Sequence, residues 1–164
     1  ILGGGYPELH CGLLSNNHSL SAEIKGFGMN GSPIYAECGG FMFLTREIRG
    51  IEGRSFPMVG LFPLRVQMED RFKALGYREV VTRKESILGP PGTLIRGHEF
   101  HYSQIIDKGG PVEEIYSVTD RKNTTHHAEG FLKNRTLGSY IHQHWGSNPQ
   151  VAGNFVEYCR RFGN

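Results

Sequence analysis

Cys38 stands in a segment whose order is typical of a catalytic nucleophile. The apolar run Ile34-Tyr35-Ala36 lies just before it, and Gly39 and Gly40 follow it directly. A strand, a nucleophile, a glycine turn and a helix in this order form a nucleophile elbow, which presents the reactive atom above a sheet. Amides at the start of the helix would favour the thiolate, lower the cysteine pKa and hold a developing oxyanion. The pattern predicts a nucleophile, and a buried structural cysteine is the alternative.

The other two cysteines lack this setting. Cys11 has no apolar strand before it, and Cys159 lies in a segment predicted to be helical. Three cysteines do not suggest a disulfide framework. We therefore expect thiols kept in a reducing compartment, the cytoplasm.

A base for the cysteine is predicted near the C-terminal end of the chain. His142 ends a predicted strand over residues 136–142. A histidine at the end of a strand can act as a general base toward a cysteine that is distant in sequence and close in space. We predict that His142 takes the proton of Cys38.

The remaining histidines leave a metal site open as an alternative. His144 would point the same way as His142 along a strand. His98 and His101 add possible ligands, but not at the helical H-E-x-x-H spacing. We expect no metal, and assign structural or substrate-positioning roles to His98, His101 and His144. The pair His126-His127 lies in a polar stretch and is predicted to be a solvated turn.

The elements that must position these residues follow from apolar periodicity and from glycine and proline breaks. Helices are predicted at 20–25, at 39–46 and at 148–161. The first has Ser19 as its N-cap; Gly26 and Gly28 weaken its continuation, and Gly31-Ser32-Pro33 breaks it. Strands are predicted at 34–36, within 58–68, at 77–82, as one or two strands within 93–106, at 115–118 and at 136–142. This pattern predicts an α/β layered fold with a mixed central sheet and a strand-rich extension.

Length and charge limit the classes of function. The 164 residues suit one domain, 1–164. A net charge of +2 with interleaved signs argues against a nucleic-acid surface and against a polybasic membrane patch. No apolar run approaches the roughly 18 residues of a membrane span. Ile1-Leu2 leads into glycines without an initiator Met, so we expect a first strand and further polypeptide before it.

Six motifs in order resemble the C-terminal glutamine amidotransferase domain of the cobyrinic acid a,c-diamide synthase family. Any one of them is weak, but six in order over nearly the whole chain are specific. They are GGGYPE (3–8), YAECGG (35–40), LGYR (75–78), RGHEFHYS (96–103), GSYIH (138–142) and GSNP (146–149).

The resemblance implies a class I glutamine amidotransferase-like fold. It implies that Cys38 is the nucleophile, that His142 is the catalytic histidine, and that the oxyanion hole lies at Gly4, Gly5 and Gly39. Glutamine would be the substrate, with no cofactor in this domain. An N-terminal synthetase domain of the same polypeptide would bind ATP, Mg²⁺ and a tetrapyrrole, whose a and c acetate side chains are amidated in cobalamin biosynthesis. We leave a homodimer open.

Two positions depart from the wider class I pattern. Many class I members complete a triad with glutamate two residues after the histidine, where this chain has His144. Many also have glutamine four residues after the cysteine, where this chain has Met42. We therefore expect a Cys–His dyad. The alternatives are a nickel-sirohydrochlorin a,c-diamide synthase domain, another cysteine hydrolase, and a non-catalytic or metal-binding α/β module. We place residues 96–103 near the active-site mouth or the domain interface.

Overall fold

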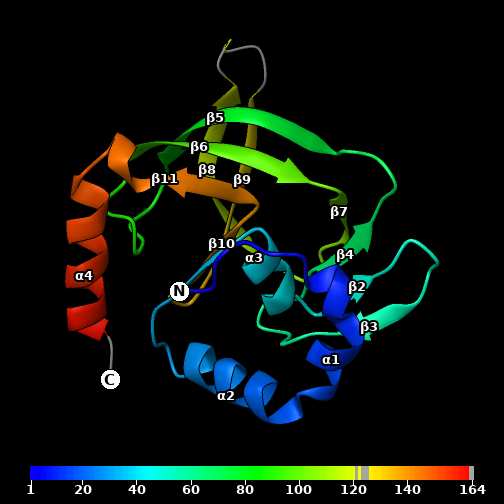
Figure 1. Ribbon diagram of the computed structural model, residues 1–164. Coiled ribbons are helices and arrows are strands. Elements are labelled where there is room, and N and C mark those ends of the chain that lie inside the picture. Colours follow the sequence, from blue (N-terminus) through cyan, green and yellow to red (C-terminus); the bar gives the residue numbers. More distant parts are fainter. Residues whose placement is uncertain (121, 123–125, 163–164) are drawn as a thin grey trace.

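The computed structural model of the protein describes residues 1–120, 122 and 126–162 (Figure 1). The helices are η1 (Pro7–His10), α1 (Cys11–Asn16), α2 (His18–Met29), α3 (Gly39–Leu44), η2 (Trp145–Ser147) and α4 (Gln150–Phe162). The strands are β1 (Ile34–Glu37), β2 (Glu47–Arg49), β3 (Ser55–Pro57), β4 (Arg65–Met68), β5 (Ala74–Thr82), β6 (Leu94–His101), β7 (Ser103–Asp107), β8 (Glu113–Asp120), β9 (His126–Lys133), β10 (Thr136–Ser139) and β11 (Ile141–His144).

The strands of the described residues form two sheets. The seven-stranded sheet has the order β1-β10-β9-β8-β5-β6-β11, in which β1 and β10 are parallel and the other neighbours are antiparallel. The four-stranded sheet has the order β3-β2-β4-β7, with β2 and β4 parallel. The chain passes from the first sheet to the second at Tyr102, between β6 and β7.

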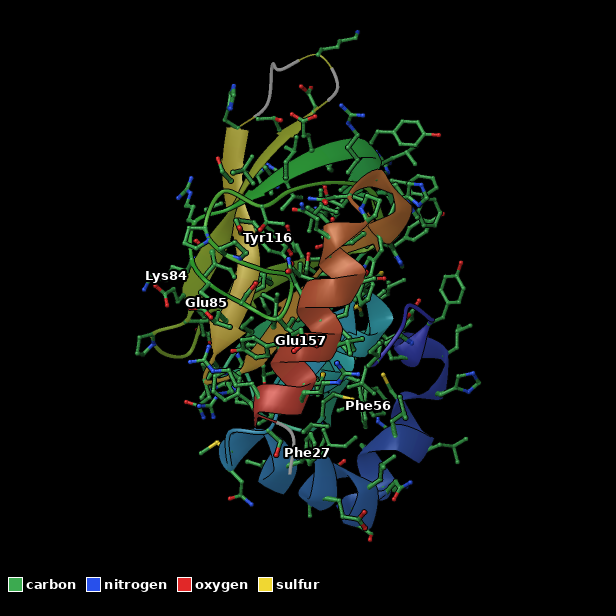
Figure 2. The ribbon with its side chains drawn as sticks, turned by 90° about the vertical axis from the view of Figure 1, so that its left-hand side faces the viewer. Phe27, Phe56, Lys84, Glu85, Tyr116 and Glu157 are labelled. Carbon is green, nitrogen blue, oxygen red and sulfur yellow. The ribbon has the colours of Figure 1, made fainter. Side chains whose placement is uncertain are left out.

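Two apolar cores lie on opposite faces of β1, because successive side chains of a strand point to opposite sides. Ile34 and Ala36 belong to the core shared with α3 and the four-stranded sheet. Tyr35 belongs to the core that includes Val151 of α4. Figure 1 places α4 on one side of the strands and the four-stranded sheet on the other, and Figure 2 shows α4 lying in front of the strands. The predicted α/β fold with a mixed sheet is confirmed.

The first predicted helix is longer than the sequence pattern indicates. It runs over His18–Met29, and its N-cap is Asn17 and not the predicted Ser19; the Asn17 side chain accepts a hydrogen bond from the Leu20 amide at 3.2 Å. The helix continues through Gly26 and Gly28, which were expected to weaken it, and ends before the predicted break at residues 31–33. A Cβ at residue 28 would stand 2.9 Å from the Leu61 side chain. The glycine therefore lets the helix pack closely, and this contact outweighs its low helix propensity.

Several other predicted elements differ from the structure. The predicted strand 136–142 divides at Tyr140: β10 pairs with β1 and β9, whereas β11 pairs with β6. The pair His126-His127 is not a solvated turn, because it begins β9 and lies opposite Thr119 and Val118 of β8. Strand formation within 58–68 is limited to Arg65–Met68, and the helix predicted at 39–46 ends at Leu44.

None of the helices in the described part of the chain is long and apolar enough to cross a membrane.

Candidate active site

The backbone at Cys38 has the geometry of a nucleophile elbow. Cys38 joins β1 to α3 with φ 44° and ψ −106°. Among the described residues, Asn134 is the one other non-glycine residue with a positive φ. Such backbone costs on the order of 1–3 kcal/mol and persists where the surroundings impose it. Here the Cys38 amide donates to the Ser139 carbonyl at 2.7 Å, and its carbonyl accepts from the Met42 amide at 2.8 Å.

The N-terminal glycine segment packs against the start of α3. The Gly40 amide donates to the Gly3 carbonyl at 3.0 Å. A Cβ at Gly39 would overlap the Gly5 backbone, and one at Gly40 would overlap the Leu2 carbonyl. Glycine is required at both positions because two backbones approach closely there. Two predicted oxyanion residues, Gly5 and Gly39, are thereby neighbours.

His142 lies on β11 directly opposite His98 of β6. Their rings stack with centroids 4.7 Å apart and planes inclined by 6°. The Gly4 backbone covers the His142 ring so closely that a Cβ at residue 4 would overlap the ring at Cε1. The predicted site residues Gly4 and His142 are therefore in contact, and Gly4 leads directly to the Gly5–Gly39 contact.

Glu37, the residue before the nucleophile, links the two edges of the large sheet. It ends β1, one edge strand, and its Oε1 accepts from the Gln143 amide of β11, the other edge strand, at 2.9 Å. The Tyr35 hydroxyl donates to the same oxygen at 2.6 Å. Glu37 Oε2 lies 3.7 Å from His142 Nδ1. Sequence reasoning missed this residue, although a carboxylate at the end of an apolar strand was a visible signal.

The Cys38 thiol is protonated in this setting. The pKa of Cys38 is raised to about 11, chiefly by burial; a hydrogen bond from the Gly39 amide lowers it, and the charges of Glu8, Glu37 and Glu99 raise it. The prediction that the helix start lowers this pKa was wrong because desolvation outweighs one amide. The thiol donates to the Phe100 carbonyl at 3.7 Å.

His142 is neutral at rest for a related reason. Burial lowers the pKa of its imidazole, and the neighbouring His98 and His101 lower it too, whereas the Glu37 carboxylate raises it. Among the described residues no hydrogen bond joins the Cys38 thiol to the His142 ring. In the ligand-free structure the two groups are thus a neutral thiol and a neutral imidazole.

A small pocket opens onto the Cys38 sulfur. Its volume is about 20 Å³, far below the roughly 300–1,000 Å³ of typical small-molecule sites. Tyr6, Glu8 and Met42 line it together with the segment from Phe100 to Ser103. That segment is the second half of residues 96–103, which we predicted to lie near the active-site mouth or the domain interface.

A buried ion-pair network supports the pocket from β6. Glu99 binds Arg78 Nε at 2.7 Å and His101 Nε2 at 2.9 Å. His101 Nδ1 lies 2.8 Å from the Ser103 carbonyl, and its ring stacks on Tyr140 at 3.9 Å. Burial alone would raise the pKa of Glu99, but the hydrogen bonds and charges of His101 and Arg78 lower it below its ordinary value. Glu99 is therefore an ionised carboxylate at neutral pH.

The structure also bears on the metal-site alternative and on the two residues at the end of β11 and just after it, His144 and Trp145. Over the ranges 1–120, 122 and 126–162, no group of three or more His, Cys, Asp or Glu side chains is arranged to hold a metal ion. His144 is exposed at the end of β11. Trp145 packs edge-on against Tyr35 at 5.6 Å and contacts Phe155 of α4 at 5.1 Å, so it belongs to the core beneath α4.

Comparison with known proteins finds one family over most of the chain. Residues 1–150 match the CobB/CobQ-like glutamine amidotransferase domain. A cobyrinate a,c-diamide synthase of Leptospira interrogans (strain Fiocruz L1-130) is 48% identical over 97% of this chain and 35% of its own length. A hydrogenobyrinate a,c-diamide synthase of Streptomyces coelicolor is 35% identical over 98% of this chain and 31% of its own. The chain thus spans about a third of the length of these relatives.

Solved structures agree on the fold. A crystal structure of a glutamine amidotransferase superposes with a TM-score of 0.62 at 16% identity, covering 96% of this chain and 77% of that one. The crystal structure of a glutamine amidotransferase from Thermotoga maritima gives a TM-score of 0.53 at 14% identity, covering 96% of this chain and 60% of that one. The predicted class I glutamine amidotransferase-like fold is confirmed.

Proposed function

The chain belongs to the CobB/CobQ-like glutamine amidotransferase family of enzymes, and on this premise we propose that it is the glutaminase domain of an ATP-dependent tetrapyrrole a,c-diamide synthase. It hydrolyses the side-chain amide of glutamine and delivers ammonia to a synthetase portion of the same polypeptide. The corrin precursors cobyrinate and hydrogenobyrinate are the favoured acceptors, because the relatives at 48% and 35% identity bear those names.

The observation that carries this proposal is the strained elbow at Cys38. Its φ of 44° turns the chain sharply from β1 into α3. The same turn brings Gly39 against Gly5, while Gly4 covers the His142 ring. A nucleophile, a base and converging backbone amides are the components of acyl transfer.

In the proposed reaction, Cys38 Sγ attacks the side-chain amide carbon of glutamine. His142 takes the thiol proton as the C–S bond forms and passes it to the leaving nitrogen. Because the pKa of Cys38 is raised to about 11, the thiol keeps its proton until this step. Its hydrogen bond to the Phe100 carbonyl must break first.

The tetrahedral oxyanion is held by amides of Gly39 and of the Gly4–Gly5 turn, each contributing typically about 3–4 kcal/mol to the barrier reduction. Ammonia leaves and a γ-glutamyl thioester remains on Cys38. Water, activated by His142, then hydrolyses the thioester and releases glutamate. The thiol is regenerated.

The remaining chemistry belongs to the synthetase portion. We place ATP, Mg²⁺ and the tetrapyrrole there, as the family resemblance implies. In that portion an acetate carboxylate would be activated at the expense of ATP and attacked by ammonia. We place the enzyme in the reducing cytoplasm, where its free cysteines remain thiols.

We place the contact with the synthetase portion around the pocket mouth. Phe72 is half exposed, and its ring lies 5.1 Å from Phe100 and 4.2 Å from Tyr102, both of which line the pocket. Tyr6 also lines the pocket and is 59% exposed. An aromatic rim is typical of interfaces, and covering it would keep ammonia from solvent.

Replacement of the nucleophile tests the proposal. In the full-length synthase, Cys38→Ser should abolish glutamine-dependent amidation while amidation from free ammonium continues. Cys159→Ser in α4 is the matched control and should keep both activities. Full glutamine hydrolysis by Cys38→Ser would remove this cysteine from the mechanism. An intact enzyme that hydrolyses no glutamine would refute the function itself.

A further inference from the structure

The Cys–His pair lacks an orienting carboxylate on the strand of its histidine. The residue two positions after His142 is His144, which is exposed and cannot act as an acceptor anion. A neutral imidazole exists as two tautomers, and only the one with a proton on Nδ1 leaves Nε2 free as a base. A group that accepts a hydrogen bond at Nδ1 would select that tautomer.

We infer that Glu37 is this group: it positions His142 and holds its proton on Nδ1, reaching it from the nucleophile's own strand. This inference rests on the proposed function. Glu37 Oε2 lies 3.7 Å from His142 Nδ1, with side-chain exposures of 17% and 25%. That separation is too long for a good hydrogen bond. Catalytic hydrogen bonds in ligand-free enzymes are often long and shorten in the substrate complex.

The other carboxylate oxygen of Glu37, Oε1, is held by two hydrogen bonds, which leaves Oε2 as the oxygen nearest to His142. Oε1 accepts from the Tyr35 hydroxyl at 2.6 Å and from the Gln143 amide at 2.9 Å. Tyr35 is 2% exposed, so its ring cannot move freely. With one oxygen held by donors on two edge strands, rotation of the carboxyl group away from His142 would cost at least one of these bonds.

The ring of His142 is constrained in turn. His98 stacks on it at 4.7 Å with nearly parallel planes. The Gly4 backbone closes in on the ring as well, since a Cβ at that position would overlap it. These two contacts restrict the ring, while its Nδ1 stays 3.7 Å from Glu37 Oε2.

Charge supports the same assignment. The groups that act on the His142 imidazole are Glu37 from β1 and His98 and His101 from β6. Glu37 is the anion of this set and the group that raises the pKa of the ring, so it stabilises the imidazolium that forms when Cys38 loses its proton. Removing its charge should make His142 a weaker base.

A purely structural bridge between β1 and β11 is the competing explanation, and Glu37→Gln separates the two. The amide oxygen of glutamine can still accept from Tyr35 and Gln143, but the group facing His142 becomes uncharged. In the full-length synthase we expect kcat for glutamine hydrolysis to fall about 100-fold, with KM for glutamine within about threefold. The acid limb of the pH profile should move to lower pH, because loss of the anion lowers the pKa of His142.

His144→Gln is the matched control, since it changes the position where a triad carboxylate would stand on the histidine's own strand, and its kcat should stay within about twofold of wild type. Unchanged kcat and pH profile in Glu37→Gln would overturn the inference while leaving the glutaminase function intact. Failure of the wild-type enzyme to hydrolyse glutamine would instead refute the proposed function.

A second measurement does not depend on any variant being folded. Nitrogen NMR of the wild-type protein with labelled histidine reports which ring nitrogen of His142 carries the proton above the pH at which it ionises. We expect the proton on Nδ1, which is the form that Glu37 selects. A proton on Nε2 of His142 would overturn the inference.

Discussion

Two glutamate–histidine pairs lie near Cys38, and they differ in whether the nitrogens of the histidine ring have hydrogen-bond partners. In the β6 pair, Glu99 and His101 are 2.9 Å apart and about nine-tenths buried, and the second ring nitrogen of His101 is engaged by the Ser103 carbonyl. In the pair that joins β1 to β11, Glu37 and His142 are 3.7 Å apart and partly exposed.

The comparison suggests how a structural histidine differs from the proposed catalytic one. Both ring nitrogens of His101 face protein acceptors, the Glu99 carboxylate and the Ser103 carbonyl, so neither is directed toward a substrate. The His142 ring forms no hydrogen bond within the described residues, which leaves Nε2 available as a base. A tight, satisfied pair stabilises the fold, whereas a loose pair retains the freedom that proton transfer needs.

The largest effect is expected at His142. His142→Asn should lower kcat for glutamine hydrolysis by about 10³-fold or more, because the thiol with its raised pKa has lost its proton acceptor. The free energy of unfolding should change little. Steady-state kinetics and urea unfolding of the same preparation measure both. Wild-type turnover in His142→Asn would remove the base from the scheme.

In contrast to His142→Asn, His101→Asn should lower stability more than turnover. Loss of one partner from the buried Arg78–Glu99–His101 network should lower the free energy of unfolding by about 3 kcal/mol. Turnover at a temperature where the variant is folded should fall far less than in His142→Asn. If His101→Asn were as stable as wild type and as inactive as His142→Asn, the roles of the two histidines would be reversed.

A third carboxylate sharpens the comparison, because Glu129 is buried without a cationic partner among the described residues. It accepts from the Ser139 hydroxyl at 2.6 Å and from the Tyr140 amide at 2.7 Å, and burial raises its pKa to about 7. The unfolded chain loses this proton near pH 4.5 and the folded chain only near 7, so stability falls as pH rises between these values.

Glu129→Gln should remove that pH dependence. Glutamine resembles the protonated carboxyl, so the variant should gain about 2 kcal/mol relative to wild type between roughly pH 5 and pH 8. Urea unfolding at several pH values measures the difference. Parallel stability curves for wild type and variant would show that Glu129 keeps an ordinary pKa in the folded protein.

The smallest effect concerns the charge of Glu8 beside the nucleophile. Glu8 raises the pKa of Cys38, although less than burial does. Glu8→Gln should therefore increase the thiolate fraction and speed alkylation of Cys38 by iodoacetamide near pH 8 by about threefold. Mass spectrometry of the modified peptide follows the rate. A slower reaction would contradict the sign of this electrostatic effect.

The elbow could be predicted from sequence because its signals are local. An apolar strand, a cysteine and two glycines in succession predict a strand-to-helix turn, and in the structure Cys38 occupies that turn with a positive φ. The mixed sheet followed from alternating strands and helices in the same way. Gly4 and Gly5 were placed through family resemblance, and their contacts with His142 and Gly39 agree with that placement.

The protonation, contacts and roles of side chains that are remote in sequence could not be predicted from the sequence. The raised pKa of Cys38 depends on burial and on carboxylates from three separate segments. The role inferred for Glu37 depends on β1 and β11 meeting, although they lie at opposite ends of the strand order. The persistence of α2 through Gly28 likewise depends on Leu61, which is remote in the chain. Long-range packing decides each of these.

The hydrogen bond from Cys38 to the Phe100 carbonyl has a consequence for the lifetime of the idle enzyme. Peroxide and other oxidants attack thiolates, and a protonated, capped sulfur in a pocket of water-molecule size is a poor target. Under the proposed function, an incoming amide would widen the pocket and free the sulfur. The thiol would then be shielded from oxidation in the ligand-free protein and exposed to it only during glutamine hydrolysis.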